Sequence, residues 1–379
     1  MELFANVGSW GSWLFFWVIP FLFILTIVVF FHELGHFLIA RWCGVRVLVF
    51  SVGFGRELIG FTDRHGTRWK LAAIPLGGYV KFFGDENAAS VPDQDQLATM
   101  NETEKRVSFP HKNVGQRAAI VAAGPIANFI LAIVLFAAFF AFYGKPTAPA
   151  LVDAVQPGSA AEAAGFRDGD LVTAIDGRKI ETFTDMQRLV MDSAGQTLRI
   201  VVERDGKEQT LTAVPKLVET KNALGFKHRQ GVLGLRGKPG PLETVGIGSA
   251  FKLGVEESWM VVERTLSYIR GVFAGRESLD QLGGPIMIAQ ASRQVATAGF
   301  FPLLHFAGVV SISIGFLNLF PIPLLDGGHL LYYAIEAVRG RPLSERAQEY
   351  GFRIGLAIVL MLMIFTTFQD ILRSIPWIS

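Results

Sequence analysis

Long apolar runs constrain the fold of this chain more than any other feature of its sequence. Residues 13–31 contain no charged side chain, residues 118–142 contain Asn128 as their one strongly polar group, and residues 300–325 contain no Asp, Glu, Lys or Arg. Helices of this length can cross a hydrocarbon core of about 30 Å. A shorter run at residues 354–368 predicts a further span, although its end is polar. We therefore expect a polytopic α-helical membrane protein with about four transmembrane helices.

Composition agrees with this fold class. Hydrophobic residues make up 51% of the 379 residues, and the 32 Phe among them are unusual for soluble domains. The first run is too long for a signal-peptide core and has no basic residue before it, so we expect it to be retained as a span. The single cysteine, Cys43, excludes an intramolecular disulfide and a multi-cysteine metal site. A formal net charge of +2 gives no reason to expect nucleic acid as a partner.

The distribution of positive charge in short loops predicts the orientation. Residues 1–12 contain no Lys or Arg, whereas the connections between the first two and the last two spans are basic. The basic residues include Arg41, Arg46, Arg56, Arg64, Arg68 and Lys70 in one connection, and Arg339, Arg341, Arg346 and Arg353 in the other. Both connections should therefore be cytoplasmic. The termini and the long segment between the second and third spans should lie on the outer side, which for the inner membrane of a Gram-negative bacterium is the periplasm.

The layout predicts four parts: residues 1–143 with the first two spans, 144–220 with a compact periplasmic module, 221–299 with a helical connector, and 300–379 with the last two spans. The module should be α/β, because β-type runs such as Leu198–Glu203 and Glu208–Val214 alternate with turn signals, and one helix fits at Thr184–Ser193. In the connector, Ala250–Phe273 spaces apolar residues at helical intervals. That helix could lie on the membrane surface or pack on the module. Its amphipathic pattern is compatible with both positions.

A membrane-associated β-hairpin is expected between the first two spans. Residues 45–61 and 68–83 are rich in β-formers and Gly, and they flank the turn-like sequence Asp63–Gly66. Residues 84–115 are polar and irregular, which predicts a loop.

The sequence His32-Glu33-Leu34-Gly35-His36 is the HExxH pattern of zinc hydrolases. Residues four apart on a helix lie about 40° apart, so both imidazoles can face one ion. Glu33 can take a proton from a water that the metal has made acidic. Ionisable groups are costly in hydrocarbon, which favours a functional role over histidines satisfied by helix–helix hydrogen bonds. At 1.5 Å per residue, His32 lies about 28 Å from Trp13, near the cytoplasmic side.

A catalytic zinc requires a third protein ligand and an open position. Asp326, at the end of the third apolar run, is the best candidate, because antiparallel spans would bring it to the depth of His32. It could instead cap the helix that follows, and His329 is a rival ligand of lower rank. Pro321 and Pro323 break the helix and leave carbonyls and amides that a substrate strand could use.

The stretches FFHELGHF and NLFPIPLLDGGH together resemble the site-2 protease family of intramembrane zinc metalloproteases, and specifically its bacterial RseP-type branch. Three further stretches resemble blocks of the same branch in the same order: GFG at Gly53–Gly55, PLGGYVKF at Pro75–Phe82 and AGPIANF at Ala123–Phe129. The resemblance covers nearly the whole chain, and the joint occurrence of these stretches is highly specific.

This resemblance implies roles for individual residues. His32, His36 and Asp326 would bind Zn²⁺, Glu33 would be the general base, and Asn318 would contact the substrate backbone or the oxyanion. The hairpin, which contains Gly53 and Gly55, resembles the family's membrane-reentrant β-element, which would accept an unwound substrate as an added strand. Unwinding is also physically necessary, because an intact helix hides its peptide carbonyls in its own hydrogen bonds.

The module contains Gly165–Gly177, GFRDGDLVTAIDG, which resembles the PDZ signature of bacterial periplasmic proteases. PDZ grooves capture chain ends by strand addition, but this one could act mainly as a gate that excludes substrates with large outer domains. Relatives of the RseP type carry two such modules in tandem, whereas one is recognisable here.

We therefore predict an intramembrane zinc endopeptidase with an inserted PDZ domain. The resemblance implies single-span membrane proteins as substrates, such as an anti-sigma factor or a signal-peptide remnant. One alternative is a non-proteolytic PDZ membrane scaffold, for which Glu33 would be dispensable. Another is a metal transporter that uses His32, His36 and Asp326 as a transit site. The sequence identifies neither the scissile bond nor the oligomeric state.

Overall fold

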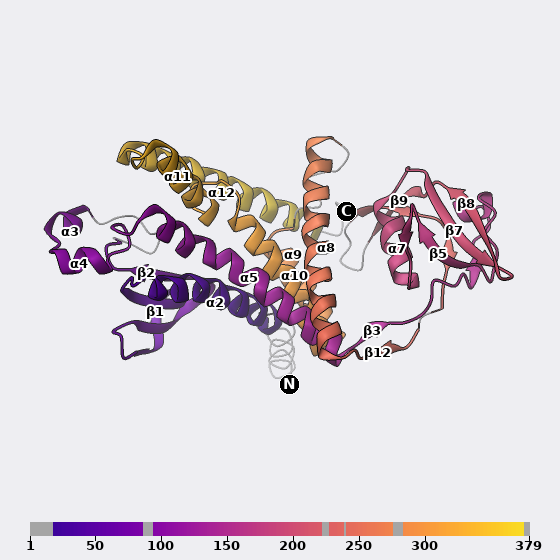
Figure 1. The fold of residues 1–379 in the computed structure, drawn as a ribbon, viewed down its shortest axis with the longest axis horizontal. Helices are drawn as coiled ribbons and strands as arrows, with labels where there is room; N and C mark the ends of the chain where they lie inside the picture. The colour runs from indigo at the N-terminus through magenta and orange to yellow at the C-terminus, as the bar shows by residue number, and fades with distance from the viewer. Residues whose placement is uncertain (1–17, 86–93, 222–226, 239, 276–282, 375–379) are drawn as a thin grey trace, which may run out of the picture. The chain divides into compact units, whose positions relative to one another are not determined.

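The computed structural model describes residues 18–85, 94–221, 227–238, 240–275 and 283–374. The chain divides into two compact units (Figure 1). One combines Met1–Phe139 with Gly248–Ser379, and the other is Phe140–Ile247. We call them the helical unit and the strand-rich unit.

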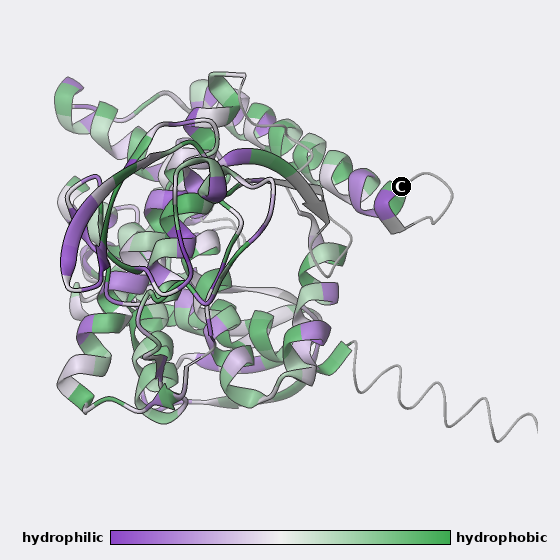
Figure 2. Cartoon of the chain, turned by 90° about the vertical axis from the view of Figure 1, so that its right-hand side faces the viewer, coloured by the Kyte–Doolittle hydropathy of each residue, from purple (hydrophilic) through white to green (hydrophobic). Residues whose placement is uncertain are grey.

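Four helices are long and apolar enough to cross a membrane. They are α2 (Ile19–Trp42), α5 (Val114–Phe142), α10 (Phe300–Asn318) and α12 (Glu345–Ser374). These helices fit the four predicted spans, although residues 13–17 of the first apolar run lie outside the described residues. Apolar side chains of α12 such as Leu360, Met361 and Ile364 are exposed, as expected of a helix that faces lipid, and Figure 2 shows this hydrophobic stretch on the helix that leads to the C-terminus.

Small residues let the spanning helices approach closely, as is usual for helix pairs in membranes. A Cβ added at Gly35 would lie 2.2 Å from the backbone oxygen of Ala123, so α2 crosses α5 there with almost no space between them. On α10, a Cβ added at Gly315 would lie 3.0 Å from Cβ of Asn128. Helix α5 therefore packs against both α2 and α10. The shared apolar core consists of Ile24, Val28, Leu131, Leu303, Ala307 and Val310.

The predicted hairpin is confirmed as the antiparallel pair β1 (Val47–Thr62) and β2 (Arg68–Phe82). Phe50 holds it against α2, because its ring stacks on Trp69 at 4.2 Å between centroids and packs edge-on against Phe37 of α2 at 5.6 Å. Towards the turn, Leu58 and Ile59 are 61% and 71% exposed, so this end of the hairpin presents an apolar surface.

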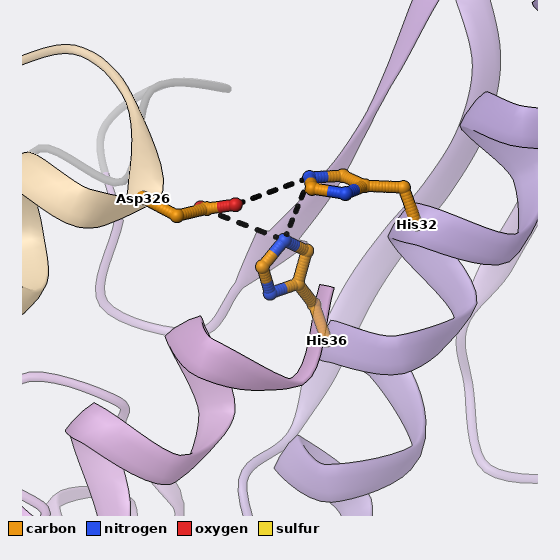
Figure 3. Close-up of side chains that lie close together, drawn as sticks. All are labelled: His32, His36 and Asp326. Atoms are coloured by element: carbon orange, nitrogen blue, oxygen red, sulfur yellow. Dashed lines mark hydrogen bonds and ion pairs between the residues drawn. The ribbon is translucent and has the colours of Figure 1, made fainter. Parts of the chain in front are cut away.

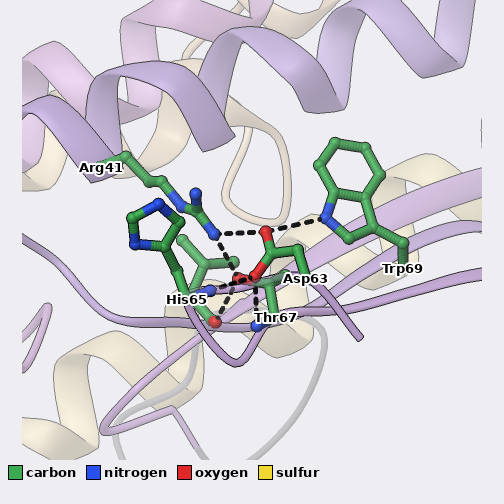
Figure 4. A network of polar contacts seen from close by, with 6 residues as sticks. Arg41, Asp63, His65, Thr67 and Trp69 are labelled. Carbon is green, nitrogen blue, oxygen red and sulfur yellow. Dashed lines mark hydrogen bonds and ion pairs between the residues drawn. The ribbon is translucent and has the colours of Figure 1, made fainter. Parts of the chain in front are cut away.

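A polar network ties the hairpin turn to the end of α2 (Figure 4). Asp63 accepts hydrogen bonds from the backbone N–H groups of His65 and Thr67, from the Trp69 indole and from the Arg41 guanidinium. Burial alone would raise the pKa of the Asp63 carboxyl, but these donors hold it well below its usual range. The turn is therefore fixed by a carboxylate that stays ionised at neutral pH.

The expectation that residues 84–115 form a loop is wrong in part. Two short helices, α3 (Gln94–Thr99) and α4 (Glu102–Val107), occupy the middle of this segment. Helix α4 begins with a capping box in which Asn101 and Glu104 each accept a hydrogen bond from the other's backbone N–H. This capping signature is visible in the sequence and indicates a helix, although the polar composition of the segment suggests a loop.

A tight turn at residues 319–325 connects α10 to α11 (Asp326–Arg339). Leu324 has a positive φ of 102°, a conformation that costs a non-glycine residue about 1–3 kcal/mol. Gly327 and Gly328 admit the turn, because a Cβ added to them would lie 2.2 Å from the oxygen of Phe320 and 2.4 Å from the oxygen of Ile322, respectively. The two glycines therefore let the chain fold back onto the start of α11.

The strand-rich unit is built around a four-stranded sheet in the order β6-β5-β7-β8. Its strands are β5 (Leu171–Ile175), β6 (Arg178–Lys179), β7 (Leu198–Arg204) and β8 (Lys207–Ala213). Helix α6 (Ala160–Ala163) precedes β5, and α7 (Phe183–Asp192) connects β6 to β7. Val172, Ile200 and Met186 form part of the buried core, to which both the sheet and α7 contribute. The α/β character predicted for the module is confirmed.

Short strands continue beyond residue 220, where the sequence predicts a helical connector. The strand pairs are β3 (Lys145–Pro146) with β12 (Leu242–Glu243), β4 (Ala154–Val155) with β11 (Leu235–Arg236), and β9 (Lys216–Lys221) with β10 (Lys227–Val232). Two of these pairs join segments far apart in the chain, which local periodicity cannot reveal. Helices follow only afterwards, at α8 (Ile247–Phe273) and α9 (Pro285–Thr297).

Helix α8 turns its small residues towards α5. A Cβ added at Gly254 would lie 2.7 Å from the backbone oxygen of Ile133, and Glu257 of α8 lies 3.3 Å from His305 of α10. The predicted apolar stripe lies elsewhere on the helix, where Phe251 and Trp259 are 55% and 68% exposed. Within the helical unit, α8 therefore packs through its small and polar residues and leaves its aromatic stripe uncovered.

Candidate metal centre

The two histidines of the HExxH motif point at the same position (Figure 3). His32 and His36 lie one turn apart on α2, and their Nε2 atoms are 3.3 Å apart. The carboxylate of Asp326 completes the group, with Oδ2 at 3.2 Å from Nε2 of His32 and Oδ1 at 3.6 Å from Nε2 of His36. One ligand atom from each residue lies within 4.8 Å of the other two. The structure thus brings together the three predicted ligands from two distant parts of the chain.

Asp326 reaches the histidines because it is the first residue of α11. The N-cap of that helix is Leu325, and no side chain caps it, so the alternative in which Asp326 only caps the helix is not what the structure shows. His329 lies one turn further along α11 and is not part of the three-residue group. Asp326 therefore directs its carboxylate at the position that both histidines face.

The donor set suits a zinc ion. Two imidazole nitrogens and one carboxylate oxygen are ligands that catalytic zinc sites use, and three protein ligands leave a position open for water or substrate. Oδ2 of Asp326 is buried and has no well-aligned hydrogen-bond partner among the described residues, as expected of an oxygen that awaits a cation. The side chains of His32, His36 and Asp326 are 12%, 11% and 16% exposed, so the group is shielded but reachable.

Glu33 lies between the metal group and the hairpin. The backbone N–H of Val80 in β2 is an electrostatic partner of its carboxylate. A Cβ added at Gly78 would lie 3.1 Å from Cγ of Glu33, so glycine lets the strand come this close. Strand β2 therefore orients the carboxylate beside the two histidines.

Helix α5 supplies partners that the sequence does not assign. The backbone oxygen of Ile120 lies 2.9 Å from Nδ1 of His36, and the side-chain amide of Asn128 lies 3.2 Å from Nδ1 of His32. Gly124 lies between them in the chain, and a Cβ there would be 2.2 Å from Nε2 of His36. The signal that could have found Asn128 is its position as the one strongly polar residue in an apolar run.

The residues expected to bind substrate lie outside the three-residue metal group. Gly53 and Gly55 belong to β1 with φ values of 92° and 83°, where the pairing of β1 with β2 is irregular. Asn318 is the last residue of α10, and Pro321 is exposed in the turn that follows. The carbonyl of Pro323 faces α12, because a Cβ added at Gly355 would lie 1.6 Å from it. That carbonyl is therefore covered and is not an open hydrogen-bond acceptor.

Comparison with known proteins places these features in a family context. The model of peptidase family M50 matches residues 20–362, a range that includes α2, α5, the strand-rich unit and the turn before Asp326. The match therefore covers every residue of the metal group.

Named relatives extend over almost the whole chain. A protein of Rhizobium meliloti that is named a zinc metalloprotease is 50% identical over 361 residues, covering 93% of this chain and 95% of the relative. A similarly named protein of Brucella suis is 48% identical, covering 93% and 94%. The metalloprotease MmpA of Caulobacter vibrioides is 41% identical, covering 94% and 95%.

Proposed function

The chain belongs to peptidase family M50 and is a zinc metalloendopeptidase of the site-2 type, and we propose that it cuts single-span membrane proteins within or at the edge of the bilayer. The observation that carries this proposal is the convergence of His32, His36 and Asp326 in a chain with four candidate spans. A hydrolytic site on membrane helices favours a substrate that enters from the bilayer.

In the proposed mechanism, His32, His36 and Asp326 would hold a zinc ion, which when bound would supply Lewis-acid activation of water and of the scissile carbonyl. Glu33 takes the proton of the attacking water on its carboxylate and delivers it to the departing amide nitrogen. The Val80 N–H keeps this carboxylate turned towards the site. Because the water loses one proton and the amine gains it, Glu33 ends the cycle as it began.

Substrate binding in this proposal uses the hairpin and the turn before Asp326. A locally unwound substrate would pair as an added strand beside Gly53 and Gly55, where the irregular pairing leaves backbone groups for a new partner. Asn318 would contact the substrate backbone or the oxyanion, and Pro321 would line the entry. For Pro323 we propose an indirect part, since its carbonyl faces α12.

The strand-rich unit would be a PDZ domain in the periplasm of a bacterium whose inner membrane holds the spans. The motif at Gly165–Gly177 and the α/β core around it support this assignment. In that place the domain would exclude membrane proteins whose outer parts are still large. The substrate class would then be proteins already shortened outside, such as an anti-sigma factor or a signal-peptide remnant.

The test compares purified full-length protein with Glu33→Gln, His36→Ala and the matched control Glu102→Gln, whose side chain is 84% exposed. Zinc content is measured by mass spectrometry, and cleavage is measured on a model single-span substrate in detergent and on the same cleavage segment as a soluble peptide. We expect Glu33→Gln to keep zinc and lose cleavage, His36→Ala to lose both, and Glu102→Gln to match the unaltered protein.

Two outcomes would refute the proposal in different ways. Cleavage by Glu33→Gln at the unaltered rate would remove the general base and with it the mechanism. Faster cleavage of the soluble peptide than of the membrane-inserted substrate would remove the intramembrane substrate class, while the metalloendopeptidase activity would stand.

A further inference from the structure

Asn128 is the most deeply buried polar side chain beside the metal group. It lies in the middle of α5 and is 0% exposed. Its amide nitrogen lies 3.2 Å from Nδ1 of His32, while its Oδ1 is buried and has no hydrogen-bond partner among the described residues. A buried amide in an apolar span is costly unless it has a task, and His32 is the side chain that it reaches.

The chemistry of His32 decides which way this amide points. Nε2 of His32 faces Asp326 and His36, so a metal held there would take the lone pair of Nε2. A neutral imidazole that ligates through Nε2 carries its proton on Nδ1, which is then a donor. An amide nitrogen is also a donor, and two donors cannot share a hydrogen bond. Oxygen and nitrogen of an Asn amide are interchanged by a half-turn of the group, so Oδ1 is the atom that fits opposite Nδ1–H.

His36 shows the same arrangement without ambiguity. Its Nδ1 lies 2.9 Å from the backbone oxygen of Ile120, which can only accept a hydrogen bond. Nδ1 of His36 therefore carries the proton, and its Nε2 offers a lone pair to the metal group. Ile120 and Asn128 are both on α5, so one helix would supply the acceptor for each histidine.

The position of Asn128 is fixed from the opposite side by α10. The hydroxyl of Ser311 donates a hydrogen bond to the backbone oxygen of Asn128 at 2.8 Å. Gly315 leaves only the space that Cβ of Asn128 fills, because a Cβ added there would lie at 3.0 Å. The side chain of Asn128 is therefore held against α2 and cannot withdraw from His32 without moving a helix.

We propose that Asn128 is a positioning residue that fixes the tautomer and the ring orientation of His32 by accepting the Nδ1–H hydrogen bond through Oδ1. The inference rests on the proposed function, because it assumes that His32 binds the metal. Outer partners of this kind commonly change metal affinity by about 10–100-fold when they are removed. Asn128 is fully buried and would act only through the imidazole.

The test measures zinc affinity of the full-length protein in detergent, by competition with a chromophoric chelator. Asn128→Leu removes the acceptor at similar volume and should weaken zinc binding roughly 10–100-fold. Asn128→Asp keeps an acceptor and lacks a donor, so it should bind zinc within a few-fold of the unaltered protein. Ser313→Ala is the matched control, because its hydroxyl bonds to Val309 within its own helix. The melting temperature of each metal-free variant reports folding separately from metal binding.

Unaltered zinc affinity in a folded Asn128→Leu protein would overturn the proposal. So would an Asn128→Asp protein as weak as Asn128→Leu, because Asp keeps the acceptor and nearly the shape of Asn, and a loss shared by both variants would mean that the amide acts as a donor. If Asn128→Leu does not fold, Asn128→Ala carries the same expectation. His32→Ala separates the two proposals: full zinc affinity in that variant would refute the ligand set itself, whereas its loss alongside a normal Asn128→Leu would refute only the role of Asn128.

Discussion

Glycine at two positions sets the distance between the helices that build the metal group. Gly35, inside the HExxH motif, brings α2 against the backbone of Ala123, and Gly124 leaves room for the ring of His36. Neither glycine has a positive φ, so glycine is needed there because it has no side chain and not because of its backbone freedom. A single methyl group at either position would have to displace a helix or a histidine.

We predict that Gly124→Ala lowers zinc affinity by roughly tenfold or more, because the new Cβ would lie 2.2 Å from Nε2 of His36 and would push the ring out of the group. Zinc content after dialysis against a weak chelator measures this. Gly115→Ala on the same helix is the control, since its Cβ would meet only the side-chain oxygen of Asn113 at 3.5 Å. Equal loss in both variants would mean that the effect comes from the helix and not from His36.

At the scale of elements, the hairpin depends on its anchor at the end of α2. The β1–β2 pair is long and exposes apolar residues near its turn, yet it must present Gly78 and Val80 to Glu33. Asp63 accepts hydrogen bonds from four donors, two in the turn, one on Trp69 and one on Arg41. The hydroxyl of Thr67 in turn donates a hydrogen bond to the backbone oxygen of Val47. The carboxylate of Asp63 therefore holds the turn of the hairpin to the end of α2.

Replacing Asp63 with Ala should loosen the hairpin locally by about 1–3 kcal/mol, because the Trp69 indole and the Arg41 guanidinium would lose a shared acceptor. Hydrogen exchange of the amides in residues 47–82 should be faster in Asp63→Ala, with α5 unchanged. Arg64→Ala, an exposed position in the same turn, should exchange like the unaltered protein. Uniform protection in all three proteins would show that the network does not hold the hairpin.

The strand-rich unit has its own electrostatic tie. Asp170 is 0% exposed and binds Arg204 through two hydrogen bonds of 2.7 and 2.8 Å, while Arg204 also donates to the oxygen of Gly165. Burial alone would raise the pKa of Asp170, but the bonds from Arg204 and from the backbone of Arg167 lower it. This pair joins the turn before β5 to the end of β7.

The pair makes the stability of the strand-rich unit depend on pH in a defined direction. Because the folded-state pKa of Asp170 is lowered, its contribution is complete above the unfolded pKa of about 4 and declines as the pH falls through the folded value. Asp170→Asn should destabilise the unit by about 3 kcal/mol near neutral pH, and the difference should shrink in acid. Hydrogen exchange of β5 and β7 in the full-length protein, compared at matched pH, measures it. A difference that grows in acid would contradict the assignment.

At the scale of the whole molecule, four candidate spans leave two kinds of connection between them. Basic residues crowd the segments that follow α2 and α11, while the strand-rich unit lies in the long connection between α5 and α10. Charge asymmetry predicts that these two kinds of connection lie on opposite sides of the membrane.

Cysteine labelling tests this orientation, because the chain contains only Cys43. In a Cys43→Ser background, Lys207→Cys in the strand-rich unit should react with a membrane-impermeant maleimide in intact spheroplasts. Arg341→Cys, in the exposed connection between α11 and α12, should react only after lysis. Labelling of both cysteines from one side would contradict four spans arranged in this way.

Much of the site was predictable because its first half is local. His32, Glu33 and His36 lie on one helix within five residues, so helical periodicity alone places both imidazoles on one face. The hairpin strands and helix α7 also follow from short patterns. The strands β11 and β12 were missed, because their partners β4 and β3 lie far away in the chain.

Residue types at fixed short spacings were enough to predict the apolar spans and the pair of histidines. The packing of the helices was needed to show that Asp326 meets those histidines, that Ile120 and Asn128 contact their Nδ1 atoms, and that the carbonyl of Pro323 faces α12. The histidine partners on α5 are 84 and 96 residues away from their imidazoles along the chain. Contacts over such separations depend on how helices cross, and helix crossing is set by the shapes of both surfaces together.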